Sequence, residues 1–183
     1  MQVTKLERSG YMLEYPTFFL VFNYTREEGR KLEKALSQDP DKAVVFLVTH
    51  NHRSAFDSDI FNLAQNHRRV YVLSNDISGQ EVPDTAPVAW MSGGDSIENV
   101  ADKDIRIEAD KDGDKGVAYY VTTPDSTVFY GGALGTDKTR QQTDVLIERI
   151  ASSHNKVGLA MVNENIADSF AAKIATARLL TYE

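Results

Sequence analysis

The sequence contains no cysteine, and no apolar run in it is long enough to cross a membrane. The missing cysteines exclude disulfides, thiolate metal ligands and a cysteine nucleophile, and they fit a reducing compartment. The longest apolar runs, residues 18–22 and 43–48, have the length of strands, whereas a membrane-spanning helix needs about 20 residues. Residues 1–8 lack the apolar core of a signal peptide. We therefore expect a cytoplasmic protein with no membrane partner.

Basic residues are fewer than acidic residues. The chain has 20 Lys and Arg against 27 Asp and Glu, which gives a formal net charge of −7. Binding to a phosphate backbone needs a basic surface, and the one basic cluster, His67-Arg68-Arg69, is too short to supply it. We therefore expect no nucleic-acid partner. An unknown small molecule or a protein, including a second copy of the chain, remains as the expected partner.

The pattern of apolar residues predicts an α/β protein. We find no repeat and no linker, so the 183 residues are expected to form a single domain over 1–183. Strands are predicted at 3–7, 11–15, 17–23, 43–49, 70–74, 88–91, 105–109, 117–122, 127–130 and 157–162, and helices at 26–36, 58–66, 138–152 and 167–180. The strand–loop–helix–strand order of residues 43–74 predicts a parallel pair, and the tight polar turns that follow predict antiparallel pairing.

Two histidines, His50 and His52, follow the buried strand 43–49. Ligands of α/β sheets usually bind at the carboxyl ends of parallel strands. Residues two apart on an extended segment point to the same side, so both imidazoles can approach one ion, for which zinc or iron is the natural choice. The alternative is that both are polar loop residues with no ligand. The pattern alone leaves both interpretations open.

The segment around these histidines resembles a known family. Residues 48–61, Val-Thr-His-Asn-His-Arg-Ser-Ala-Phe-Asp-Ser-Asp-Ile-Phe, are similar to the metallo-β-lactamase signature, in which a strand ends in S/T-H-x-H-x-D-H before a helix. Residues 91–97, 116–121 and 128–134 resemble, in order, a Gly-Asp turn and two strands of small lactonase-like hydrolases of that superfamily. The resemblance implies an αββα sandwich with two mixed β-sheets packed face to face and helices outside. It also implies metal-dependent hydrolysis.

The sequence departs from the family at most of the metal ligands. Ser54 and Ala55 stand where the family has the Asp and His of the second metal site, and Ala133 stands where it has the bridging Asp. The remaining histidines, His67 and His154, are not in family ligand positions, and the chain ends where many relatives continue to a final ligand histidine. Whether another chain supplies that region is left open. The resemblance therefore identifies a degenerate member of the superfamily.

Nearby aspartates offer a partial replacement. Asp57, Asp59, Asp76 or Asp95 can supply a carboxylate at the same edge of the sheet, although helix capping and turns are the commoner use of such residues. Asp57 in particular is placed to cap the helix that contains Ile60 and Phe61. Catalytic zinc ordinarily needs about three protein ligands and a water. The candidate metal ligands are thus His50 and His52, with Asp57 and Asp59 as weaker candidates.

Two further sequence patterns resemble known ligand-binding loops. Residues 132–139, Gly-Ala-Leu-Gly-Thr-Asp-Lys-Thr, are one residue away from a phosphate-binding loop, but Asp137 replaces the second glycine, and a helix capped by Thr136 or Asp137 is the simpler interpretation. Residues 110–116 alternate carboxylates as a calcium loop does, but they lack the Gly and Glu that an EF-hand needs. An acidic hairpin turn is the simpler interpretation.

Two hypotheses for function follow. The first is a non-catalytic binding or interaction protein with a degenerate site and no cofactor. The second is a divergent single-metal hydrolase that uses His50 and His52 with a nearby Asp and binds zinc, iron or manganese. Metal content is the property that separates them.

Overall fold

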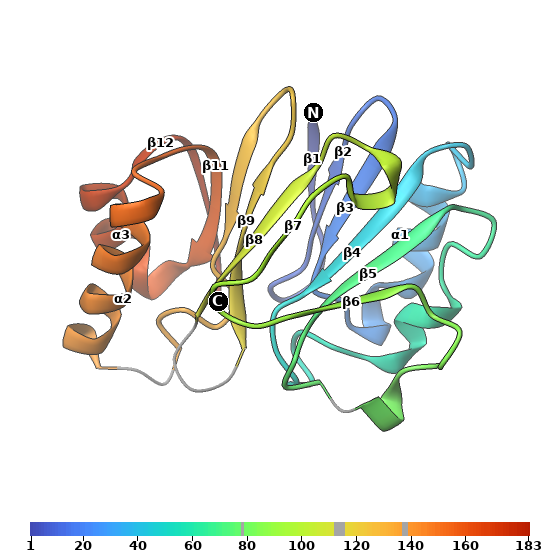
Figure 1. The fold of residues 1–183 in the computed structure, drawn as a ribbon, viewed down its shortest axis with the longest axis horizontal. Coiled ribbons are helices and arrows are strands. Elements are labelled where there is room, and N and C mark those ends of the chain that lie inside the picture. The colour runs from blue at the N-terminus through green and yellow to red at the C-terminus, as the bar shows by residue number, and fades with distance from the viewer. Residues whose placement is uncertain (78, 112–115, 137–138) are drawn as a thin grey trace. The chain divides into compact units, whose positions relative to one another are not determined.

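The computed structural model describes residues 1–77, 79–111, 116–136 and 139–183. Contacts divide the chain into two compact units, of which unit 1 comprises Met1–Met91 with Val100–Lys103, and unit 2 comprises Ser92–Asn99 with Asp104–Glu183. Each unit contains one six-stranded sheet, sheet A in unit 1 and sheet B in unit 2 (Figure 1). The expectation of a single domain over residues 1–183 stays a prediction.

Sheet A is mixed, and its strands follow one another in chain order. They are β1 (Gln2–Lys5), β2 (Tyr11–Glu14), β3 (Phe18–Phe22), β4 (Ala43–Val48), β5 (Arg69–Ser74) and β6 (Val88–Met91). The first three strands pair antiparallel, and β3 to β6 pair parallel. The predicted parallel pair of residues 43–49 and 70–74 is confirmed, with Phe46 opposite Tyr71. Every residue of β3 and β4 is buried, as interior strands of a parallel sheet require.

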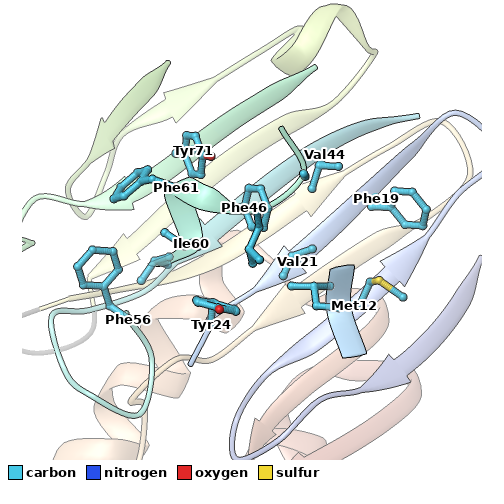
Figure 2. Packing of buried hydrophobic residues seen from close by; sticks show 14 of the residues in the cluster. Met12, Phe19, Val21, Tyr24, Val44, Phe46, Phe56, Ile60, Phe61 and Tyr71 are labelled. Carbon is cyan, nitrogen blue, oxygen red and sulfur yellow. The ribbon is translucent and has the colours of Figure 1, made fainter. Parts of the chain in front are cut away.

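One face of sheet A packs against α1 (Gly29–Leu36) and the 3₁₀ helix Ser58–Asn62. Leu32 and Leu36 of α1 are fully shielded from solvent, and Ile60 joins them from the 3₁₀ helix. Figure 2 shows the aromatic part of this core, in which the ring of Phe46 stacks on that of Tyr71 with centroids 5.1 Å apart. This packing fixes the loop between β4 and the 3₁₀ helix from both ends.

Sheet B is also mixed. Its order is β12 (Ala175–Tyr182), β11 (Lys156–Asn163), β10 (Thr127–Tyr130), β9 (Val117–Thr122), β8 (Arg106–Lys111) and β7 (Ser96–Ile97). The strands β7 to β10 pair antiparallel, and β10, β11 and β12 pair parallel. The prediction of antiparallel pairing is confirmed for the strands at 105–109, 117–122 and 127–130, but it is wrong for residues 88–91, because β6 pairs parallel with β5 in sheet A. Helices α2 (Arg140–Ser153) and α3 (Ala167–Lys173) pack on this sheet through Ile147, Ile150 and Phe170.

The structure corrects two predicted helices. Residues 167–180 do not form one helix, because α3 ends at Lys173 and β12 begins at Ala175. The Ala and Leu residues of this segment favour a helix locally, but pairing with β11 outweighs that preference. The helix predicted at 58–66 is a 3₁₀ helix that stops at Asn62, since Leu63 is extended. No helix in the described ranges has both the length and the apolar character needed to cross a membrane.

Candidate functional site

The segment that carries His50 and His52 leaves sheet A at the carboxyl end of β4. It bends at once, because the backbone N–H of His52 donates to the carbonyl of His50 at 3.1 Å. The N–H groups of Ala55 and Phe56 then donate to the carbonyl of His52 at 2.8 and 2.9 Å. The two imidazole rings lie nearly parallel, with centroids 6.0 Å apart. The two rings therefore lie beside each other, and a bend rather than an extended strand brings them there; their joint approach to one ion stays a prediction.

A buried residue that the sequence reasoning missed holds the start of this loop. Asn23 follows β3 with a positive φ of 52° and is 1% exposed. Its side-chain oxygen accepts hydrogen bonds from the backbone N–H and from the hydroxyl of Thr49, both at 3.0 Å. Its amide group donates to the hydroxyl of Ser9 at 3.4 Å, and that hydroxyl donates to the carbonyl of Ser54 at 3.2 Å. Asn23 thus ties the hairpin β1–β2 to both ends of the histidine loop.

These hydrogen bonds determine where His50 carries its proton. A hydroxyl has one proton, and the Thr49 hydroxyl gives it to Asn23 Oδ1, which can only accept. The contact of 2.9 Å between Thr49 Oγ1 and His50 Nδ1 is then a hydrogen bond that the imidazole donates. A proton on Nδ1 leaves the lone pair of the neutral ring on Nε2. His50 therefore has the tautomer that a histidine needs to bind a metal through Nε2.

His52 has the opposite tautomer. The backbone N–H of Ser54 donates to His52 Nδ1 at 3.3 Å, and the Ser54 hydroxyl lies 2.8 Å from the same nitrogen. A nitrogen that accepts from an N–H carries the lone pair, so the neutral ring has its proton on Nε2. In this tautomer neither nitrogen of His52 presents a lone pair to a metal; binding through Nε2 would require the proton on Nδ1, where the Ser54 hydroxyl can accept it in place of the hydrogen bond from the Ser54 N–H. Ser54, which stands where the family has an aspartate, is the residue that forms hydrogen bonds with His52.

The predicted aspartate ligands Asp57 and Asp59 lie beside a different group. Asp57 caps the 3₁₀ helix by accepting from the N–H of Asp59 at 2.9 Å, which confirms the capping prediction. Asp59 forms an ion pair with Arg26 at 2.6 Å, and Asp57 lies 3.8 Å from the same guanidinium. The Asp59 carboxylate accordingly raises the pKa of Arg26. Arg26 is the cation that the structure shows at these two carboxylates.

Asp76 is the carboxylate that contacts the histidine loop. It follows β5, and its Oδ2 accepts from the backbone N–H of Asn51 at 3.0 Å. Its Oδ1 is shielded from solvent and has no hydrogen-bond partner in the described part of the chain. Asp95, the fourth aspartate considered, accepts from the N–H of Ser92 at 2.7 Å and closes a turn in unit 2.

The other two histidines lie elsewhere in their units. His67 Nδ1 lies 2.8 Å from the carbonyl oxygen of Lys42, at the amino end of β4, whereas His50 follows its carboxyl end. His154 ends α2 in unit 2, where its ring stacks on Tyr120 with centroids 3.8 Å apart. Its Nε2 lies 3.8 Å from Asp110, whose pKa is raised by burial. Within unit 1, His67 therefore lies at the opposite end of β4 from His50.

A buried carboxyl group lies under the hairpin that supports the loop. Glu28 is 1% exposed, and both oxygens of its carboxyl group are shielded from solvent. A Cβ on Gly10 would meet these oxygens at 2.8 and 2.9 Å, so the carboxyl lies directly against the turn that carries Ser9. Burial, and to a smaller extent the charge of Glu7, raise the pKa of Glu28 to about 8.

The competing patterns have no support as ligand sites. Helix α2 is capped by Thr139, whose hydroxyl accepts from the N–H of Gln142 at 3.3 Å, so the prediction of a cap at Thr136 or Asp137 is wrong. Asp137 and Lys138 of the phosphate-loop pattern, and residues 112–115 of the calcium-like pattern, lie outside the described residues.

The donors do not fit the metal site that the resemblance implies. Among residues 1–77, 79–111, 116–136 and 139–183, no three His, Asp or Glu side chains are grouped so that they could hold an ion. Ala55, at the family's next ligand position, is fully buried, so a histidine there would overpack the site. What the arrangement provides chemically is two neighbouring imidazoles, each in contact with a hydroxyl group through Nδ1, and one carboxylate bonded to the loop backbone.

Comparison with known proteins identifies the fold. No protein-family model matches the sequence, and the search of curated proteins finds no match. Solved structures do match, at low identity. Igni18, a metallo hydrolase from Ignicoccus hospitalis, is 11% identical with a TM-score of 0.61, and the alignment covers 88% of this chain and 69% of Igni18. The metallo-β-lactamase fold protein YhfI from Bacillus subtilis is 15% identical with a TM-score of 0.55, covering 85% and 63%.

A CmlA β-hydroxylase mutant also matches, at 11% identity and a TM-score of 0.57, over 88% of this chain. The chain spans 34% of the length of that protein and 63% of the length of YhfI. The class that the two mixed sheets and these neighbours define is the metallo-β-lactamase fold, which confirms the resemblance seen in the sequence. At these identities the likeness is one of fold.

Proposed function

We propose that this chain is a non-catalytic binding or interaction protein built on the metallo-β-lactamase fold. The observation that carries the proposal is the hydrogen bonding of His52. The backbone N–H of Ser54 donates to Nδ1, so in the neutral ring of the metal-free chain the proton is on Nε2 and no lone pair is directed to a metal. Hydrogen bonds within the protein thereby orient the side chain of His52. In a metal site, the bond to the metal would orient it.

Charge around the loop supports the same proposal. Two of the candidate aspartates, Asp57 and Asp59, face Arg26. A catalytic metal needs about three protein ligands and an ordered water. Apart from His52, the candidate ligands at the loop among the described residues are His50 and Asp76, and those are too few to define a nucleophile.

One observation favours a second candidate, a single-metal site. Asp76 Oδ1 is buried with no hydrogen-bond partner in the described ranges, and its carboxylate is bonded to the backbone between the two histidines. If the proton of His52 moved to Nδ1, where the Ser54 hydroxyl can accept it, then His50, His52 and Asp76 would supply three ligands of the types that zinc accepts. This candidate requires a change of tautomer at His52 and convergence of the three side chains, which the first proposal does not.

Metal content distinguishes the two. Protein purified without a His tag and without chelators is analysed for zinc, iron and manganese, beside the double variant His50→Ala/His52→Ala. His67→Ala is the matched control, because it removes a histidine at the other end of β4. The proposal expects sub-stoichiometric metal that is the same in all three proteins. Near-stoichiometric metal that is lost only in the double variant would overturn it and establish the single-metal site.

A further inference from the structure

The four sheet edges of the protein differ in how they are protected. An exposed edge strand presents unpaired N–H and C=O groups, so proteins usually keep such strands short or charged. Three edges follow that rule: β1 and β6 have four residues each, and β7 has two. The fourth edge, β12, has eight residues, and among the residues that the structure describes it pairs on one side only, with β11.

Strand β12 also lacks the usual protective residues. Its sequence, Ala-Thr-Ala-Arg-Leu-Leu-Thr-Tyr, contains one charge, Arg178, and no proline. Its two leucines are only partly buried, although Leu179 packs on the core formed with α2 and α3. Successive side chains of a strand point to opposite faces, so Leu180 lies on the other face of sheet B. An added strand would therefore complete the burial of one leucine on each face.

We propose that this added strand is β12 of a second copy, paired antiparallel around a two-fold axis that joins the two B sheets. The proposal rests on the interaction role proposed above and names the partner. An antiparallel homodimer of this kind keeps each face of the sheet on the same side, so opposite residues must both be odd or both even in number. Two registers then pair almost every residue of one β12 with the other. In one register the two-fold axis passes at Arg178, and in the other it passes at Leu179.

Charge selects between these registers. Centring on Arg178 places two guanidinium groups directly opposite each other, and like charges in that position destabilise a strand pair. Centring on Leu179 places the two Leu179 side chains opposite each other and sets Arg178 against Leu180. It also sets the exposed residues Ala177 and Thr181 against each other. A second copy in this register therefore brings no like charges into opposite positions and packs the two partly buried Leu179 side chains against each other, so the strand is compatible with itself as a partner.

The sequence has no cysteine, so single cysteines test this register without interference. Opposite residues of an antiparallel pair lie about 4.5–5.5 Å apart between Cα atoms, within the range of a disulfide. We expect Leu179→Cys to form a cross-linked dimer under mild oxidation in the full chain. Ala177→Cys is the matched control on the same strand face, because its own counterpart lies four residues further along, roughly 13 Å away. Arg178→Cys tests the rejected register.

The mass of the untreated chain is measured in parallel by light scattering after gel filtration, with and without chelator. The proposal expects twice the chain mass in both conditions. It also expects a cross-linked dimer in Leu179→Cys and none in Ala177→Cys or Arg178→Cys. A monomer that does not cross-link through residue 179, or a dimer that cross-links through 178 or 177 instead, would overturn it. Because the mass is read with chelator present, a metal found at the histidine loop would refute the proposed function without affecting this result.

Discussion

Asn23 and Thr49 are joined by two hydrogen bonds that end on one oxygen, with the backbone N–H and the hydroxyl of Thr49 each 3.0 Å from Asn23 Oδ1. Both residues are buried, at the carboxyl ends of the adjacent parallel strands β3 and β4. The pair sets the direction of the chain as it leaves β4. It also sets the tautomer of His50 through the Thr49 hydroxyl.

Asn23→Ala is expected to lower the free energy of unfolding by about 2–4 kcal/mol. Two buried donors of Thr49 lose their acceptor, and alanine tolerates a positive φ less well than asparagine. Urea unfolding followed by circular dichroism measures the change. Asn66→Ala, at an exposed position, serves as the control and is expected to change stability little. A loss as small as that of the control would show that this network does not hold the loop.

Glu28 is expected to make the protein less stable as the pH rises. The pKa of this carboxyl is raised from 4.5 to about 8 in the folded state, so between these values the folded chain holds a proton that the unfolded chain has released. Stability falls with pH wherever the folded state binds more protons, and the loss over this window is on the order of a few kcal/mol. The nearby charges of Glu7 and Lys31 shift the pKa in opposite directions, and burial dominates.

Denaturation midpoints measured from pH 4 to pH 9 test this expectation. In Glu28→Gln the fall should vanish, because the amide has no proton to lose and nearly the same shape. Glu27→Gln, at the neighbouring exposed side chain, should keep the fall seen in the unmodified protein. An unchanged slope in Glu28→Gln would assign the pH dependence to another group.

Gly93→Ala is expected to destabilise unit 2 by roughly 1–3 kcal/mol. A Cβ at this position would lie 2.6 Å from the Cα and 2.7 Å from the backbone nitrogen of Lys111, and backbone atoms of β8 cannot move aside cheaply. Gly79→Ala is the control, since a Cβ there meets nothing within 4 Å. Thermal unfolding of both variants gives the comparison, and equal melting temperatures would contradict the close approach.

Much of the fold could be predicted from the sequence because its strands have clear signals. Buried strands such as Phe18–Phe22 and Ala43–Val48 are continuous apolar runs, and the element order matched a known family. The segment Ala175–Tyr182 was misread because its Ala and Leu residues suit a helix, whereas its conformation depends on pairing with β11. Local propensity contains no information about that partner.

The site could be predicted only in part, for a similar reason. The H-x-H spacing located His50 and His52, and the four aspartates were selected because they were expected at the same edge of the sheet. Asn23 and Ser9 were missed because they contact the loop from other strands. One signal was present: an asparagine directly after a five-residue apolar strand is a common carrier of positive φ. The tautomers of the histidines depend on hydrogen bonds that no spacing predicts.

The central claim is that Ser54 occupies His52, so that the H-x-H loop is held without a metal. Long-range proton–nitrogen NMR spectra of the imidazole groups test it most directly, recorded on metal-free protein and after one equivalent of zinc. The account predicts a proton on Nδ1 of His50 and on Nε2 of His52, with the His52 signals unchanged by zinc. A proton on Nδ1 of His52, or a stoichiometric shift of both histidines on adding zinc, would contradict it.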